Sequence, residues 1–443
     1  METCDRVTGD PPAARFAVAG GVSGDAGRAM ARVRDHDSRL HAFVSIFDAP
    51  PLASAHGPLA GLPYAAKDLF DLAGRAPTLG FASAPGPTPA RNAAVIDQLA
   101  AQGAVLIGCT AMSELAYEPS GASAERLRPQ NPWSAARICG GSSSGSAVAV
   151  AAGLVPLALG SDTAGSLRIP AHCCGVSAWK PTPGIVSSEG AMPLAPSLDA
   201  IGFLARDAAL LRAVAGVFPA AAARSAAISR VAIDHDLLAD CDPAIVQAVA
   251  QAEVMLRDDG IAVEATELRS LIKACNEPVL TLLQAEAAQI HAALLASGRL
   301  DTMLATRLGK GAALVSQIGA ARAMLARLAA DALDRAFGGA DAVLLPVLRR
   351  ATPRVAQCEP GFAEFSPRTL YELSALTRWV NGLGLPAVAL PCGVDDGALP
   401  IAAQLVGRPH ADLALLDLAT ALQARSTWHR LVPSGGSAGN SVS

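Results

Sequence analysis

Residues 140–171, GGSSSGSAVAVAAGLVPLALGSDTAGSLRIPA, decide the fold class of this chain of 443 residues. Residues 144–152 are mostly apolar and follow a run of serines, so they predict a buried helix whose N-terminus the serines cap. VPLALGSD (155–162) then predicts a buried strand, and DTAGS (162–166) a glycine-containing turn. A helix followed directly by a buried strand favours an α/β architecture with parallel strand pairs.

The flanking segments continue this alternation in both directions. Apolar runs bounded by turn residues predict strands, and segments with helical periodicity or a helix-forming composition predict helices. The predicted strands are LPYAAKDLF (62–70), AVLIG (104–108), DAVLLPV (341–347) and PAVALPCGV (386–394); the predicted helical segments are 24–48, with HAFVSIF at its end, 93–103 and 243–335.

Composition excludes several classes of protein. The chain is 51% hydrophobic and 17% charged, which supports a large packed core and excludes a disordered chain. Its net charge of −4 and the absence of a basic block argue against nucleic-acid and membrane-surface binding. The longest apolar run, 147–160, is too short to span a bilayer, and residues 1–16 lack the apolar segment of a signal peptide. We therefore expect a cytoplasmic protein with no nucleic-acid or membrane partner.

The cysteines indicate a reducing compartment and no metal site. Nine cysteines leave at least one unpaired, and none lies in a C-x-x-C motif. HCC at 172–174 contains metal-ligand types, but three adjacent side chains do not converge easily on one ion. Buried thiols are therefore expected there instead of zinc.

Three roles are compatible with the serines of residues 140–171. GSSSG (141–145) matches the G-x-S-x-G pattern of a nucleophile elbow with Ser143 as nucleophile, although a polar loop precedes it. A glycine turn before a helix also binds phosphate, but no lysine follows here in the P-loop spacing. Helix capping is the third role, for Ser166 as for the serine run.

A lysine provides a possible proton acceptor for a serine nucleophile. Only four of the 35 basic residues are lysines, and Lys67 has apolar neighbours in LPYAAKDLF. A buried, neutral lysine accepts a proton, whereas a lysine that snorkels or pairs with Asp68 has no such role. The turn before Ser166 directs N–H groups to one place, which a developing oxyanion requires.

Four long motifs together resemble the amidase signature family. They are PLAGLPYAAKDLFD (58–71), residues 140–171, CGVSAWKPTPGIVS (174–187), and GLPAVALPCG with LPIAAQLVGRP within 384–409. Their order and length are far more specific than a lone G-x-S-x-G. The resemblance covers most of the chain and implies a Ser–cisSer–Lys triad of Lys67, Ser142 and Ser166, with a cis peptide bond before Ser142.

The resemblance implies hydrolysis of a non-peptide C–N bond in a linear amide, with no metal or organic cofactor. Neutral Lys67 takes a proton through Ser142 from Ser166, which attacks the carbonyl and forms an acyl-enzyme that water hydrolyses. The expected oxyanion hole consists of the N–H groups of Thr163, Ala164, Gly165 and Ser166.

Four further residues receive supporting roles. Asp162 and Arg168 flank the nucleophile and are expected to brace its turn through an ion pair. By their place in the motif order, Ala116 and Tyr117 are expected to line the acyl pocket, although a core position fits Tyr117 equally well. One departure concerns Ala164, where many members have glycine, because a positive φ there would strain an alanine.

The resemblance also implies a fold. We expect an α/β protein with a mixed β-sheet core sandwiched between helices, forming a single large domain over 1–432 with a disordered tail at 433–443. Within this domain we expect a catalytic core at about 58–210, a variable helical region at about 243–335, and C-terminal strands and helices at about 340–425.

Three functions follow from these expectations. The first is an amidohydrolase that cleaves a small-molecule amide, for which a homodimer is one possible oligomeric state. The second is the glutaminase subunit of a tRNA-dependent amidotransferase complex. The third, a non-catalytic binding module, is disfavoured because all three triad positions are filled.

Overall fold

A computed structural model describes residues 22–48, 54, 56–123, 125–223, 226–431 and 433. The prediction for residues 1–16, and that for the tail apart from Pro433, fall outside the described residues. Within the described residues, no helix is both long and apolar enough to span a membrane.

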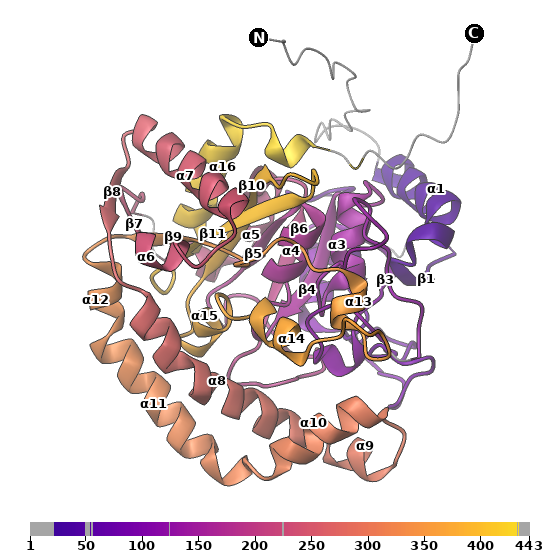
Figure 1. Ribbon diagram of the computed structural model, residues 1–443. Helices are drawn as coiled ribbons and strands as arrows, with labels where there is room; N and C mark the ends of the chain where they lie inside the picture. The colour runs from indigo at the N-terminus through magenta and orange to yellow at the C-terminus, as the bar shows by residue number, and fades with distance from the viewer. Residues whose placement is uncertain are drawn as a thin grey trace.

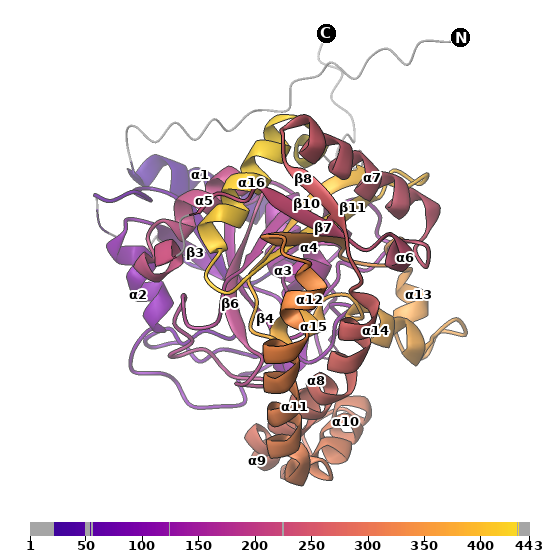
Figure 2. The ribbon, with the colours of Figure 1, turned by 90° about the vertical axis from the view of Figure 1, so that its left-hand side faces the viewer.

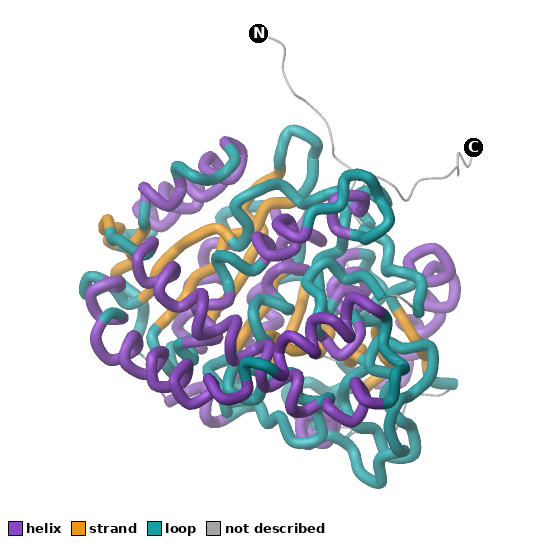
Figure 3. The backbone as a smooth tube through the Cα atoms, turned by 60° about the horizontal axis from the view of Figure 1, so that its bottom comes forward, coloured by secondary structure: helices purple, strands orange, loops and turns teal. Residues whose placement is uncertain are grey.

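The centre of the fold is one sheet, whose strands run through the middle of the molecule between helices (Figure 3). The described residues contribute eleven strands to it, in the order β1-β3-β2-β4-β6-β5-β10-β11-β9-β7-β8. Their bounds are β1 (Phe43–Ile46), β2 (Pro63–Lys67), β3 (Val105–Thr110), β4 (Leu157–Asp162), β5 (Ser177–Lys180), β6 (Ala200–Ala205), β7 (Arg230–Ile233), β8 (Ala262–Ala265), β9 (Ala342–Pro346), β10 (Ala387–Val394) and β11 (Pro400–Gly407).

The sheet is mixed. β2 runs parallel to both β3 and β4, and β7 runs parallel to β8 and β9. The central pairs β4–β6, β6–β5, β5–β10 and β10–β11 are antiparallel. The expected mixed sheet with parallel pairs is therefore confirmed.

Side chains alternate between two apolar faces along each strand, which is why helices cover both sides of the sheet. In β2, Tyr64 and Ala66 belong to one core cluster and Ala65 to the other. The first face packs against α2 (Ala94–Ala101), α5 (Ala208–Ala215), α7 (Pro243–Asp258) and α16 (Asp412–Ala424). The opposite face packs against α1 (Val22–Leu40), α3 (Ser144–Ala151), α4 (Arg168–Cys174), α8 (Arg269–Ile290), α11 (Ile318–Asp331), α12 (Leu333–Phe337) and α15 (Arg378–Gly382).

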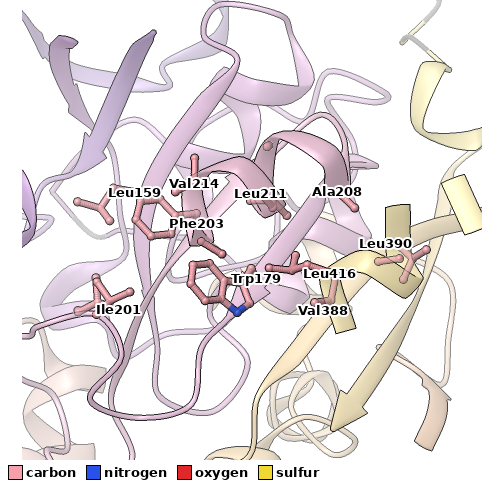
Figure 4. Packing of buried hydrophobic residues seen from close by; sticks show 14 of the residues in the cluster. Leu159, Trp179, Ile201, Phe203, Ala208, Leu211, Val214, Val388, Leu390 and Leu416 are labelled. Atoms are coloured by element: carbon pink, nitrogen blue, oxygen red, sulfur yellow. The ribbon is translucent and has the colours of Figure 1, made fainter. Parts of the chain in front are cut away.

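Aromatic packing anchors the first face. Trp179 of β5 stacks on Phe203 of β6 with ring centroids 5.9 Å apart, among aliphatic side chains from α5, α16 and β10 (Figure 4). Phe218 packs against both rings. This cluster joins elements from distant parts of the sequence into one core.

Two further helices, α13 and α14, also bury side chains in the core cluster on the opposite face of the sheet. The helical hairpin of α8 and α11, with α9 and α10, forms a lobe at one end of the molecule (Figures 1 and 2). The bounds of the remaining helices are α6 (His235–Leu238), α9 (Ala292–Ala296), α10 (Thr302–Ala312), α13 (Val355–Cys358) and α14 (Pro367–Leu373).

Most predicted elements agree with the structure, but the strands β5, β6 and β7 were not predicted, and three of the predictions differ from what is observed. In residues 24–48 the helix ends at Leu40, and HAFVSIF contributes β1. The helical region 243–335 is interrupted by the short strand β8. The serine caps of α3 are wrong: its N-cap residue, Ser143, makes no capping bond through its side chain, because that hydroxyl donates to Ser161 O at 3.1 Å.

Candidate active site

The site forms where two parallel strands end side by side. β2 ends at Lys67 and β4 ends at Asp162, with Ala66 opposite Leu159 in the register between them. The loops that leave the two strands therefore meet at one edge of the sheet. Sites in α/β proteins commonly lie beyond the carboxyl ends of parallel strands.

Lys67 is enclosed by hydroxyl groups. Its side chain is 1% exposed, and Nζ hydrogen-bonds to Ser142 Oγ at 2.7 Å and to Ser161 Oγ at 2.9 Å. Asp68 is not its partner, because that carboxylate accepts from Arg75 Nη1 at 2.8 Å. The sequence motifs suggest the contact with Ser142, but they give no separate role to Ser161.

Burial lowers the pKa of Lys67 to about 7, although the carboxylates of Asp199 and Asp162 act in the opposite direction. The amine is therefore neutral in a large fraction of molecules near neutral pH. A neutral amine has a lone pair with which it accepts a proton from a hydroxyl group.

The backbone around Ser142 is closely held. The Gly141–Ser142 peptide bond is cis, as expected from the resemblance. Gly141 N–H donates to Pro119 O at 2.7 Å, and a Cβ on Gly141 would lie 2.7 Å from Gly121 N. Only glycine fits position 141, because the backbone there packs directly against Gly121. This close packing positions Ser142 beside Lys67.

The turn after β4 carries Ser166, which is more exposed than Ser142 or Ser143. Gly165, and not Ala164, has the positive φ of this turn, at 131°, so the alanine at 164 is free of the strain that a positive φ would cause. A Cβ at Gly165 would meet Thr377 Oγ1 at 2.3 Å. Glycine is thus required at 165 by both conformation and space.

One member of the expected oxyanion hole is engaged elsewhere. Gly165 N–H donates to Asp162 Oδ1 at 2.8 Å, so it does not point to a bound substrate. Within the described chain, the N–H groups of Thr163, Ala164 and Ser166 have no protein acceptor. These three groups remain as candidate oxyanion donors.

Asp162 and Arg168 form a fully buried pair. Arg168 Nε donates to Asp162 Oδ2 at 3.0 Å, and Nη2 donates to Oδ1 at 2.9 Å. Burial alone would raise the pKa of Asp162, but the Arg168 guanidinium outweighs burial and holds that pKa at about 2. The carboxylate stays charged and accepts the N–H groups of the turn.

Residues far along the chain fix this pair and the turn. Arg168 Nη1 donates to Thr377 O at 3.0 Å and to Gln404 Oε1 at 2.9 Å. Thr377 Oγ1 donates to Ala164 O at 2.6 Å, and Asn381 Nδ2 donates to Asp162 O at 2.7 Å. Thr377, just before α15, and Asn381, within it, therefore clamp the Ser166 turn at Ala164 and at Asp162.

Replacing Arg168 with methionine is expected to lower the free energy of unfolding by about 3–5 kcal/mol, because Asp162 is left as an uncompensated buried charge. Urea titration followed by circular dichroism measures the loss. The matched control is Arg212→Met, which breaks an ion pair with Asp417 whose side chains are 36% and 61% exposed and should lose less than about 1 kcal/mol. Similar losses in the two variants would contradict the structural role of the buried pair.

Ser143 does not have the setting of a nucleophile elbow. It is buried, it follows a loop and not a strand, and its N–H donates to Ser166 O at 3.3 Å. A position under the Ser166 turn suits a supporting hydroxyl. Phosphate binding likewise gains no support, because the serine side chains face the buried Lys67 and β4.

Ala116 and Tyr117 lie in the segment that packs against Ser142, because Ser113 N–H donates to Ser142 O at 3.4 Å. Ala116 has a φ of 59°, unusual for a residue with a Cβ. The Arg307 guanidinium carbon lies 5.8 Å from the Tyr117 ring centroid, and burial raises the pKa of Tyr117 to about 12. The backbone places this segment beside the site.

The side chains of residues 172–174 point into the core. His172 Nδ1 accepts Ala402 N–H at 3.1 Å, and burial lowers the pKa of His172 to about 4. Burial raises the pKa of both thiols, Cys173 and Cys174. Among the residues with described positions, no group of three or more histidine, cysteine, aspartate or glutamate side chains is arranged to hold a metal ion.

Comparison with known proteins identifies the family of this chain. The family model described as Amidase matches residues 48–416. The chain belongs to the amidase family. The chain is 33% identical over 421 residues to the A subunit of glutamyl-tRNA(Gln) amidotransferase from Symbiobacterium thermophilum, covering 85% of each chain. It is 42% identical over 205 residues to Amidase 1 of Oryza sativa subsp. japonica, covering 46% of this chain and 44% of that protein.

Solved structures show the same fold. A crystal structure of an amidase superposes on this one with a TM-score of 0.81 and 28% sequence identity, over 92% of this chain and 96% of that chain. The mixed sheet between helical layers is thus the fold of the amidase family, and the protein is a member of a family of amidohydrolases.

Proposed function

We propose that this amidase hydrolyses a small-molecule amide through an acyl-enzyme on Ser166, with Ser142 and Lys67 as the proton relay. The observation that carries the proposal is the 2.7 Å contact between Lys67 Nζ and Ser142 Oγ inside a buried site. Hydroxyl-to-amine contact at this distance permits proton transfer.

The proposed reaction has two steps, acylation of Ser166 and hydrolysis of the acyl-enzyme, and the relay moves a proton in both. Neutral Lys67 draws a proton through Ser142 from Ser166 while the Ser166 oxygen attacks the carbonyl carbon. The tetrahedral oxyanion accepts hydrogen bonds from the N–H groups of Thr163, Ala164 and Ser166. The C–N bond breaks as the relay returns the proton to the leaving nitrogen. Water then attacks the acyl-enzyme with the relay again as base, and releases the acid.

Other residues keep this arrangement in place. Asp162 and Arg168 are positioning residues, because they hold the turn without touching the reacting atoms. Ala116 and Tyr117 are proposed to line the acyl side, on the ground that their segment contacts Ser142.

The alternative is that the protein provides the glutaminase activity of a tRNA-dependent amidotransferase complex. The relative from Symbiobacterium thermophilum, which bears a name of that kind, favours it. An amide library assayed with the purified chain alone separates the two functions. Release of ammonia or amine without any partner protein supports the stand-alone enzyme, and turnover of glutamine only after addition of partner proteins supports the alternative.

A serine-directed fluorophosphonate is expected to label Ser166, whereas EDTA is expected to leave kcat/KM unchanged. A complete serine–lysine relay explains both outcomes, because it supplies the base without a metal. Mass spectrometry of the peptide that contains residue 166 detects the label, and Ser166→Ala is the unlabelled control. Loss of activity with EDTA and its recovery with zinc would contradict the proposed mechanism.

A further inference from the structure

A cavity of about 280 Å³ opens beside the Ser166 turn. Its walls come from the loop after β5 and from the start of β6, which pairs with the end of β4. The lining residues are Thr182, Pro183, Gly184, Val186, Ser187, Ser188, Asp199, Ala200 and Ile201. None of these lining residues belongs to the proposed triad.

Two contacts connect the cavity lining to the turn that carries Ser166. Asp199 Oδ1 accepts a hydrogen bond of 2.6 Å from Thr163 Oγ1, at the start of the Ser166 turn. Ala200 lies opposite Asp162 in the β4–β6 pair. In addition, Lys67 and Asp199 are close enough for the carboxylate to oppose the lowering of the Lys67 pKa. The cavity therefore lies next to the relay.

Its lining contains one carboxylate and several hydroxyl groups. Asp199 is the acidic residue among the lining side chains, and Thr182, Ser187 and Ser188 contribute hydroxyls. Burial raises the pKa of Asp199, whereas its hydrogen bonds and the charge of Lys67 act in the opposite direction. Asp199 Oδ2 accepts the N–H groups of Leu194 at 2.9 Å and Ala195 at 3.1 Å. A carboxylate has about four acceptor positions, so this one keeps capacity for another donor.

Within the described residues, Asp199 has no ion-pair partner, unlike buried Asp162 with Arg168. A carboxylate in this position repels an acidic substituent and attracts a donor, above all a cationic one. The cavity thus suits a small amine group and disfavours a carboxylate.

We propose that this cavity is the subsite for the amine half of the substrate, and that Asp199 recognises an N–H donor or ammonium group there. The proposal rests on the acyl transfer proposed above. The leaving nitrogen must receive its proton from the relay, so substituents on that nitrogen lie on the relay side of Ser166, where the cavity is. The substrates are therefore amides of small polar or cationic amines.

The test compares two amides with the same acyl group, taken from the best substrate of the library. One carries an N-(2-aminoethyl) group and the other an N-propyl group, which has the same length but no charge. The wild type is expected to prefer the aminoethyl amide. In Asp199→Asn, the ratio of kcat/KM for the aminoethyl amide to kcat/KM for the propyl amide should fall by about 10- to 100-fold, because the variant loses a hydrogen bond between charged groups.

Asp234→Asn is the matched control. Asp234 is also buried, accepts Leu237 N–H at 2.8 Å and Leu268 N–H at 2.7 Å, and lies beyond β7. This variant should keep the wild-type preference. A general disturbance of the fold would lower kcat/KM for both amides equally and would leave the ratio of the two kcat/KM values unchanged.

A second variant keeps the proposal testable if Asp199→Asn does not fold. Ser188 lines the cavity and is exposed, so Ser188→Phe reduces the space without removing the charge. It should lower kcat/KM for an N-benzyl amide more than for the primary amide of the same acid. No preference in the wild type, or equal losses for both amides of a pair, would overturn the proposal, whereas turnover by Ser166→Ala would overturn the reaction itself.

Discussion

Ser166→Ala is expected to reduce kcat on the order of 10⁶-fold, the loss found when the nucleophile of a serine triad is removed. No acyl-enzyme forms without the hydroxyl. Ser166 lies in a turn whose backbone N–H groups at Gly165 and Leu167 donate to the Asp162 carboxylate. These bonds do not involve the Ser166 side chain, so the fold should be retained. Single-turnover kinetics measures the loss, and urea unfolding checks that stability is unchanged.

Ser143→Ala is the matched control for this substitution, since it removes the same atom from a neighbouring hydroxyl. Its Oγ donates to Ser161 O, so we expect the loss of one ordinary hydrogen bond, about 0.5–1.5 kcal/mol of stability, and retention of most activity. A large loss of activity in Ser143→Ala together with an active Ser166→Ala would identify Ser143 as the nucleophile and would refute the proposed triad.

Lys67→Arg is expected to be as inactive as Lys67→Ala. Arginine keeps the positive charge at every pH that proteins tolerate, so it has no lone pair to accept the proton from Ser142. A structural ion pair would tolerate arginine much better than alanine. Measurement of kcat/KM for both variants, with folding checked by circular dichroism, decides between the two roles. Substantial activity in the arginine variant would show that the proton acceptor lies elsewhere.

The same residue sets the expected pH dependence. The active form is the neutral amine, which increases as the pH rises through the Lys67 pKa of about 7. Activity should therefore rise with pH across that value and then level off, the opposite of a mechanism that needs a charged lysine. A profile that falls between pH 6 and 8 would contradict the assignment of Lys67 as base.

Sequence patterns predicted the framework because its determinants are local. Buried strands such as LPYAAKDLF are mostly apolar runs, and the match to the family motifs identified Lys67 at the end of one strand, Ser142 before a helix and Ser166 in a turn. The cis bond before Ser142 was predicted in the same way and is confirmed. The ion pair between Asp162 and Arg168 was predicted from their positions on either side of Ser166, six residues apart, and it is present in the structure.

Other parts of the site depend on contacts between distant segments, which no local pattern contains. Ser161 and Asp199 look like ordinary strand and turn residues, although one contacts the Lys67 amine and the other opens onto a cavity. The engagement of Gly165 N–H with Asp162 depends on a side-chain rotamer. The serine caps were wrong because tertiary partners compete for the same hydroxyls.

The clamp on the Ser166 turn has a consequence for synthesis of the protein. Thr377, Asn381 and Gln404 contact Asp162 and Arg168 across 209 to 236 residues of sequence. At ordinary translation speeds of about 5–20 residues per second, the ribosome needs roughly 10–50 s to add that length of chain. During this interval the nascent polypeptide contains Ser166 but lacks the groups that shape its turn. In the proposed mechanism, hydrolysis therefore requires that the chain has been synthesised through β11.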